Sequence, residues 1–204
     1  MNMIIGDIVE AMFKGLLRAA DVDFKDNDSV TLKLKDGTEI RGEYDMVLDG
    51  KVDDVKSASP WSYVNKFSSL ESLAKSDSFG YVSQLVGYAK AAELDVGGWW
   101  VVNKANGEFK YVSASSVDKQ AVLDDIEDLT NYINNDEPFE REFEAIEETF
   151  YRKKTGNTKL GVTCGFCAFK HKCWPTLQTL PSPNSKAKNP PMIDYITLKE
   201  EDNA

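Results

Sequence analysis

The sequence predicts an α+β (α/β) fold in which helices flank a mixed central sheet. Three observations support this class. The predicted elements follow in the order helix, three strands, two helices and two strands. Two Asp-Gly pairs, at residues 36–37 and 49–50, supply the positive φ angles that tight hairpin turns need. A hydrophobic content of 42% in 204 residues is enough for one sizeable core.

Apolar spacing and turn residues define the elements of the first half. Residues 3–20 carry apolar side chains at three- and four-residue spacings, which is typical of an amphipathic helix. Alternating apolar residues around the two Asp-Gly turns predict a three-stranded meander over residues 29–57. Ser59 and Pro60 form a helix start, with Ser59 as the cap, and this helix runs to about Lys75.

The second half begins with a helix that Asp77 or Ser78 caps and that ends near Leu94. We expect the Gly97-Gly98 pair to be a break before the next strand. The remaining predicted elements are strands at 99–103 and 108–112, a helix at 117–134, and an acidic segment at 140–148 that is solvated or forms a further helix.

The composition predicts a soluble, cytosolic protein without a membrane partner, because it contains no run of 18 apolar residues and no signal-peptide pattern. The net charge is −10, yet the eight Lys and Arg between Tyr151 and Pro190 occur without any Asp or Glu. That segment carries +8 and the remainder −18. It can hold a phosphate backbone, with Lys153 and Lys154 as candidates, although many basic tails are only solvated.

The second hairpin contains the first candidate site. We expect Leu48 to face Lys51 across the turn. In that register Asp45 lies opposite Asp54, and Lys56 shares their face. Opposed carboxylates repel unless a cation lies between them. Mg²⁺ takes one or two carboxylates and leaves its other positions to water and phosphate, and a nearby lysine can polarise a phosphate or help to deprotonate a bound water. The alternative is a solvated hairpin face.

Two helices carry further candidates. Glu10 lies in the first predicted helix, close to its apolar stripe, where a carboxylate can point at a site. The alternative for Glu10 is a surface position on the helix flank. Gln84 and Tyr88 lie one turn apart on a later helix, so their side chains share one side of it.

Three cysteines, Cys164, Cys167 and Cys173, lie within ten residues and suit a metal site in a reducing compartment better than a disulfide framework. A tetrahedral zinc site needs a fourth ligand, and His171, the only histidine of the chain, is a candidate. One alternative is a [4Fe-4S] cluster whose fourth thiolate is absent from this chain. The other is three structural thiols without metal.

Taken in order, these motifs resemble those of the RecB-like branch of the PD-(D/E)XK nuclease superfamily, and within it the CRISPR-associated and phage-encoded exonucleases with a C-terminal cysteine cluster. The resemblance spans about residues 5–175. The matching segments are Gly42-Glu-Tyr-Asp45, Asp54-Val55-Lys56, Gln84-x-x-x-Tyr88, Cys164-x2-Cys167-x5-Cys173-Trp-Pro, and Gly6-Asp-Ile-Val-Glu10, which falls where the family has a helix ending in His or Glu.

The resemblance implies roles for these residues. Asp45, Asp54 and the Val55 carbonyl would hold one or two Mg²⁺ or Mn²⁺ ions, with Glu10 completing the set. Lys56 would orient the attacking water or stabilise the pentacovalent phosphate. The Gln-x-x-x-Tyr helix would position the DNA strand. The family carries one further cluster cysteine upstream of the first helix, so either an N-terminal segment is missing here, or zinc or plain packing replaces the cluster.

The resemblance also implies an organisation and a function. It implies a restriction-endonuclease-like core at 1–150, a basic cysteine-cluster segment at 151–176 packed on that core, and an extended or disordered tail at 177–204. The implied function is a metal-dependent deoxyribonuclease, an exonuclease on single-stranded or frayed DNA ends, in the cytoplasm of a bacterial or phage-infected cell, with replication or recombination proteins as partners. The alternative is a non-catalytic nucleic-acid-binding adaptor that uses the cysteine knuckle and the basic segment.

Overall fold

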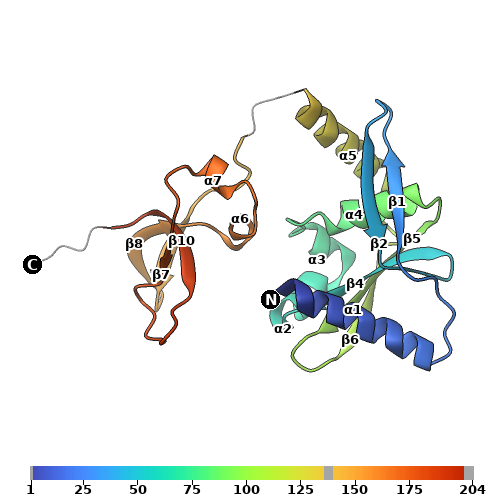
Figure 1. Ribbon diagram of the computed structural model, residues 1–204, viewed down its shortest axis with the longest axis horizontal. Coiled ribbons are helices and arrows are strands. Elements are labelled where there is room, and N and C mark those ends of the chain that lie inside the picture. The colour runs from blue at the N-terminus through green and yellow to red at the C-terminus, as the bar shows by residue number, and fades with distance from the viewer. Residues whose placement is uncertain (1, 136–139, 200–204) are drawn as a thin grey trace, which may run out of the picture. The chain divides into compact units, whose positions relative to one another are not determined.

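The computed structural model of the protein describes residues 2–135 and 140–199. The chain forms two compact units, Met1–Glu137 and Pro138–Ala204 (Figure 1). The first unit contains α1 (Asn2–Ala19), β1 (Asp28–Lys33), β2 (Glu39–Tyr44), β3 (Met46–Leu48), β4 (Lys51–Ala58), α2 (Pro60–Val64), the 3₁₀ helix η1 (Lys66–Ser68), α3 (Leu70–Ala74), α4 (Tyr81–Ala91), β5 (Asp95–Asn103), β6 (Phe109–Ser113) and α5 (Lys119–Asn134).

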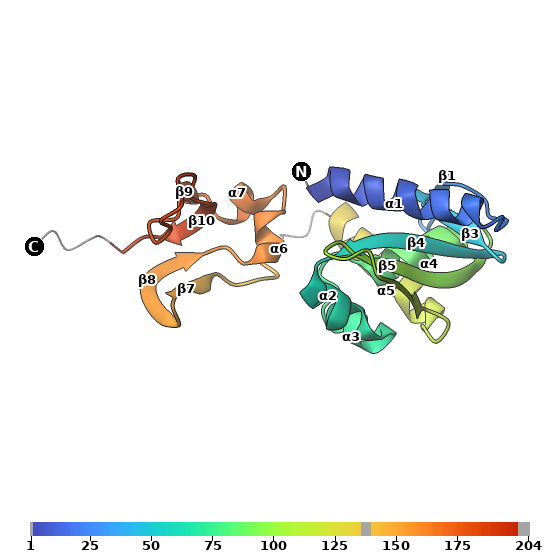
Figure 2. The ribbon, with the colours of Figure 1, turned by 90° about the horizontal axis from the view of Figure 1, so that it is seen from below.

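The first unit is an α+β fold built on a mixed sheet, as the sequence predicts. The strand order is β3-β4-β5-β6, with β4 and β5 parallel and the other two neighbouring pairs antiparallel. Val9 and Phe13 of α1 pack with Val55 on one face of this sheet. Leu85 and Val86 of α4 pack in a second cluster on the other face. Figure 2 shows α1 on one side of β4 and β5, with α2 and α3 on the other.

The predicted three-stranded meander is wrong, because the chain bends at Asp45 between β2 and β3. β1 and β2 form a separate two-stranded sheet, and only β3 pairs with β4. The outer edge of β3 is already occupied: the backbone groups of Lys25 and Val47 exchange two hydrogen bonds of 2.9 and 3.0 Å. The predicted long strand is therefore divided at the first candidate residue of the site.

The predicted break at Gly97-Gly98 is also wrong, because β5 runs through both glycines. A Cβ atom on Gly97 would lie 2.0 Å from Asp53 Oδ1, and one on Gly98 would lie 2.3 Å from the Val112 carbonyl oxygen. The side chain of Asp53 fills this space and accepts a hydrogen bond of 2.7 Å from the Gly98 backbone N–H. The glycines therefore permit a close approach inside the sheet and do not form a turn.

The helix predicted at 59–75 is divided into α2, η1 and α3. Ser59 caps α2 as predicted, since its hydroxyl accepts from the Ser62 backbone N–H at 3.2 Å. Asp77 supplies the predicted cap of α4, where its carboxylate accepts from the backbone N–H groups of Tyr81 and Val82 at 2.9 and 2.8 Å. The helix predicted at 117–134 is confirmed as α5.

The second unit contains β7 (Ile146–Phe150), β8 (Lys153–Lys159), α6 (Val162–Gly165), α7 (Lys170–Cys173), β9 (Gln178–Pro181) and β10 (Met192–Thr197). Its strands form one sheet in the order β7-β8-β10-β9. Two predictions therefore need correction. The end of the acidic segment 140–148 is a strand and not a helix, and the segment 177–204 contains two paired strands.

A buried carboxylate explains why the C-terminal segment is folded. Glu148 on β7 is 3% exposed. Its carboxylate accepts hydrogen bonds from Tyr195 on β10 at 2.9 Å and from Asn157 on β8 at 2.8 Å. These three strands share one polar core, so the boundary between units lies before β7, at Glu137/Pro138, and not at residue 150. Among the described residues, no helix is both long and apolar enough to cross a membrane.

The packing of Gly97 gives a first prediction. Replacing Gly97 by Ala should lower the free energy of unfolding by about 2–3 kcal/mol, because the new methyl group overlaps Asp53 and the Val52 carbonyl. Gly6→Ala is the matched control: no atom lies within 4 Å of its added Cβ, and alanine favours the helix by about 1 kcal/mol. Urea unfolding of both variants measures the difference, and equal stabilities would contradict this account of β5.

Candidate active site

The predicted register of the second hairpin is confirmed up to its last ladder pair. Leu48 pairs with Lys51, and the ladder ends where Met46 pairs with Asp53. Asp45 lies one residue beyond it, in the bend, so Asp45 and Asp54 are not a ladder pair. Instead, the backbone N–H of Val55 donates to Asp45 Oδ2 at 2.7 Å. The Asp45 carboxylate thus replaces a strand residue along the edge of β4.

Asp54 and Lys56 lie beside this edge on β4. Asp54 is 4% exposed, and its Oδ1 accepts a hydrogen bond of 2.7 Å from Lys56 Nζ. Its Oδ2 is buried and accepts no hydrogen bond from the residues that the structure describes. An unpaired, buried carboxylate oxygen is costly in free energy. A cation beside Oδ2 would remove that cost, so the donor set fits a bound metal ion.

The Val55 carbonyl is the third predicted ligand of this site. The N–H and C=O of one strand residue point to the same edge of the strand. Because the Val55 N–H points to Asp45, the Val55 carbonyl oxygen faces the same edge. The Asp45 carboxylate and the Val55 carbonyl therefore face one edge of β4, next to Asp54 along the strand. That Asp45, Asp54 and Val55 bind one metal ion stays a prediction.

Glu10 on α1 is coupled to this site through charge. Its negative charge raises the pKa of both Asp45 and Asp54. Its Oε1 is held at 2.6 Å by the Nζ of Lys14, which is 5% exposed and also pairs with Asp26 at 2.8 Å. The sequence analysis missed Lys14, because a lysine on a helix flank normally extends into solvent. In this structure Glu10 is paired with Lys14. The predicted role of Glu10 as a metal ligand stays a prediction.

Burial dominates the electrostatics of the site. Desolvation raises the pKa of Asp54 to about 7, opposed by the Lys56 charge and reinforced by Asp45. Desolvation also raises the pKa of Asp45, which the Val55 hydrogen bond partly offsets. The charges of Asp54 and Asp45 raise the pKa of Lys56 in spite of its burial. Lys56 is therefore protonated at neutral pH, whereas the Asp54 carboxyl titrates near neutral pH.

No group of three or more His, Cys, Asp or Glu side chains is arranged to hold a metal ion anywhere in residues 2–135 or 140–199. Mg²⁺ does not require such a group, because it usually binds through one or two carboxylates and fills its other positions with water and phosphate. The set around Asp54 agrees with this type of site. A zinc or iron–sulfur site, in contrast, needs three or four protein ligands.

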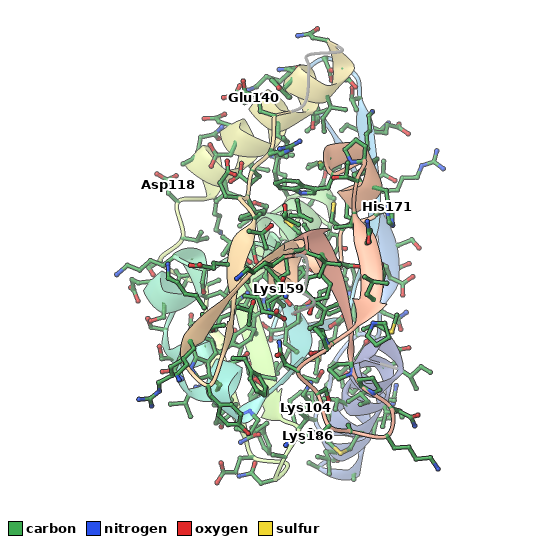
Figure 3. The ribbon with its side chains drawn as sticks, turned by 90° about the vertical axis from the view of Figure 1, so that its left-hand side faces the viewer. Lys104, Asp118, Glu140, Lys159, His171 and Lys186 are labelled. Carbon is green, nitrogen blue, oxygen red and sulfur yellow. The ribbon has the colours of Figure 1, made fainter. Side chains whose placement is uncertain are left out.

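The cysteine segment does not form such a ligand set in this structure. Cys164, Cys167 and Cys173 are free thiols, and burial, with a smaller effect of the two neighbouring thiols, raises the pKa of Cys164. His171 lies in α7 with an exposed side chain (Figure 3). The sequence expectation of a [4Fe-4S] cluster or zinc stays a prediction, and no chemical step is assigned to it.

Gln84 and Tyr88 share one side of α4, as predicted, since Gln84 Nε2 donates to the Tyr88 hydroxyl at 3.0 Å. Tyr88 also packs on Gly42, where an added Cβ would lie 2.3 Å from Tyr88 Cε1. Tyr88 of the Gln-x-x-x-Tyr motif can therefore occupy this position only because residue 42 is a glycine. Both α4 residues line a cavity of about 230 Å³ together with Arg41.

The basic candidates Lys153 and Lys154 lie on β8 of the second unit and are exposed. The Nζ of Lys154 pairs with Glu147 at 2.6 Å, so its charge is partly neutralised. Their contribution to substrate binding stays a prediction.

Comparisons with known proteins give little help with the chemistry. No protein-family model matches the chain, and no curated protein matches it either. A solved structure described as the crystal structure of SSO0001 is similar, with a TM-score of 0.41 and 15% sequence identity. The match covers 64% of this chain and 60% of that chain. A likeness at this level carries no argument about function.

Proton competition at Asp54 gives a second prediction. Mg²⁺ or Mn²⁺ should raise the thermal midpoint more at pH 8 than at pH 6, because a metal ion must displace the Asp54 proton and the pKa of that carboxyl is about 7. Asp54→Asn should abolish the shift. Asp49→Asn, at an exposed turn position, should keep it. A shift of equal size at both pH values, or one that survives in Asp54→Asn, would contradict this site.

Thiol exposure gives a third prediction. Cys167 is exposed, whereas Cys164 is half-buried with a raised pKa, so an alkylating reagent should modify Cys167 before Cys164 at pH 8. Peptide mass spectrometry over time measures the order. Protection of all three thiols until a chelator is added would instead show that they bind a metal ion, and metal analysis of anaerobically purified protein would identify it.

Proposed function

We propose that the protein is a metal-dependent phosphodiesterase that hydrolyses DNA. The observation that carries this proposal is the environment of Asp54. This buried carboxylate has one oxygen paired with Lys56 and one without a hydrogen-bond partner among the described residues. The next residue, Val55, binds a second carboxylate, that of Asp45. A purely structural carboxylate would have both oxygens satisfied, as Asp53 has.

The chain's own residues supply defined parts of such a reaction. Asp45, Asp54 and the Val55 carbonyl would hold the ion, and Glu10 lies within range of their charges. When bound, a divalent cation supplies Lewis acidity and positive charge at the phosphodiester. Lys56 has a raised pKa, so it acts as a cation that donates hydrogen bonds to a phosphate oxygen. Its protonation argues against a role as general base.

DNA is the proposed substrate class, in the form of single strands or frayed ends. The contact between Gly42 and Tyr88 supports this, because it joins the strand that leads into Asp45 to the helix expected to position a nucleic acid strand. Exonuclease action, the bacterial or phage-infected cytoplasm as its location, and replication or recombination partners are parts of the same proposal.

The non-catalytic alternative is favoured by one feature of the second unit. Phe166 and Phe169, between α6 and α7, are 67% and 68% exposed and stand next to a lysine-rich segment. Exposed aromatic rings beside cations are typical of surfaces that bind single-stranded nucleic acid. A protein of this kind would bind DNA without divalent metal and would leave it uncleaved.

Cleavage assays give the fourth prediction. The wild-type protein with Mg²⁺ or Mn²⁺ should degrade end-labelled single-stranded DNA. Asp45→Asn, Asp54→Asn and Lys56→Ala should each lower the cleavage rate by ~100-fold or more. The first two weaken the binding of the metal ion, and the third removes the positive charge beside the reacting phosphate. Asp49→Asn should retain full activity. Undiminished cleavage by Asp54→Asn would contradict the assigned site. Binding of DNA without divalent metal and without cleavage would favour the adaptor alternative.

A further inference from the structure

Tyr81, the first residue of α4, lies beside two lysines that come from different elements. The Nζ of Lys56 on β4 is 5.2 Å from the centroid of the Tyr81 ring. The Nζ of Lys66 on η1 is 4.6 Å from the same centroid. Because both distances are measured to one ring, the two ammonium groups lie less than about 10 Å apart. Lys66 therefore belongs to the surroundings of the candidate site.

The two lysines differ in their charge partners. Lys56 is paired with Asp54 at 2.7 Å. For Lys66, no carboxylate lies within ion-pair distance of its Nζ in the parts of the chain that the structure describes. Burial lowers the pKa of Lys66, and the charge of Asp77 opposes this only in part. A partly desolvated ammonium group without a paired carboxylate gains more from an anion than a fully hydrated one does.

Packing fixes the position of Lys66. The next residue, Phe67, is 3% exposed and anchors η1 in the core. Its ring stacks on Tyr81 with centroids 6.0 Å apart, and Tyr81 stacks on Phe79 at 5.9 Å. The Lys66 ammonium also lies 5.5 Å from the centroid of Phe79. The lysine thus stands over a row of aromatic rings whose buried end is held by the core.

We propose that Lys66, supported by Tyr81, binds the phosphate of a nucleotide adjacent to the one that Lys56 contacts. This rests on the proposed function and adds a second phosphate position to the same site. In a duplex the phosphates of one strand recur at a rise of ~3.4 Å per nucleotide along the axis, so the distance of less than about 10 Å between the two ammonium groups is short enough for neighbouring phosphates of one strand. The ligand is the backbone of a nucleic acid strand, since a polyanion presents one phosphate to each of two cations that come from different elements.

Binding measurements test this position without relying on cleavage. Fluorescence anisotropy of a labelled single-stranded oligonucleotide, in buffer with chelator, gives the affinity at several salt concentrations. Lys66→Ala should weaken binding several-fold and lower the slope of log affinity against log salt by about 0.7, the value for one lost contact to a single strand. Lys66→Arg should keep both. Lys75→Ala, an exposed lysine at the end of α3, is the matched control and should leave both unchanged.

A second variant separates binding from folding. Lys66→Met keeps the apolar stem on the aromatic rings and removes only the charge, so its thermal midpoint should match wild type while its salt slope falls as in Lys66→Ala. With Mg²⁺, both variants should raise KM for the oligonucleotide and leave kcat within about twofold, in contrast to Lys56→Ala. An unchanged salt slope in Lys66→Met would overturn the proposal. This test is separate from the test of the proposed function, because the salt slope can be measured even if the wild-type protein cleaves no DNA.

Discussion

The hydrogen bond from the Val55 backbone to the Asp45 carboxylate connects the fold to the candidate site. β3 is only three residues long, because the chain bends at Asp45, and Lys25 pairs with Val47 on its outer edge. Without a further partner, the edge of β4 would be unpaired beyond the end of β3. The Asp45 side chain takes the place of the missing strand residue. The same bond therefore satisfies a backbone donor and brings a second carboxylate to Asp54.

Two consecutive aspartates on β4 have opposite hydrogen-bond environments. Successive side chains of β4 point to opposite faces. Asp53 accepts from Gly98, Trp100 and Tyr111, so its buried carboxylate is fully satisfied and the glycines of β5 make room for it. Asp54 faces the other side with Lys56 as its only hydrogen-bond donor among the described residues. Burial raises the pKa of Asp54 to about 7, and the oxygen without a hydrogen-bond donor is the one at which we propose that the metal ion binds.

Three lysines around these carboxylates differ in their charge partners. Lys14 is committed to Glu10 and Asp26, and Lys56 to Asp54. Lys66 stands over aromatic rings instead. This order, from two carboxylate partners to none among the described residues, agrees with the support, catalytic and substrate-binding roles proposed for Lys14, Lys56 and Lys66 in turn.

The sequence by itself determined the parts of the protein that depend on local geometry. The Asp-Gly turn fixed the hairpin register, Ser59 and Asp77 fixed two helix starts, and the four-residue spacing of Gln84 and Tyr88 placed them together. Each of these follows from neighbours within a few residues along the chain.

Only the tertiary structure decided the rest. The Asp45 carboxylate in the bend is held by Val55, the extended Gly97-Gly98 segment accommodates Asp53, and the C-terminal segment is joined to β7 by the contact of Tyr195 with Glu148. The burial of Asp54 and the place of Lys66 beside Tyr81 likewise need residues distant in sequence. Local patterns cannot predict these features, because their free energy comes from desolvation and close packing between segments that meet only in the folded chain.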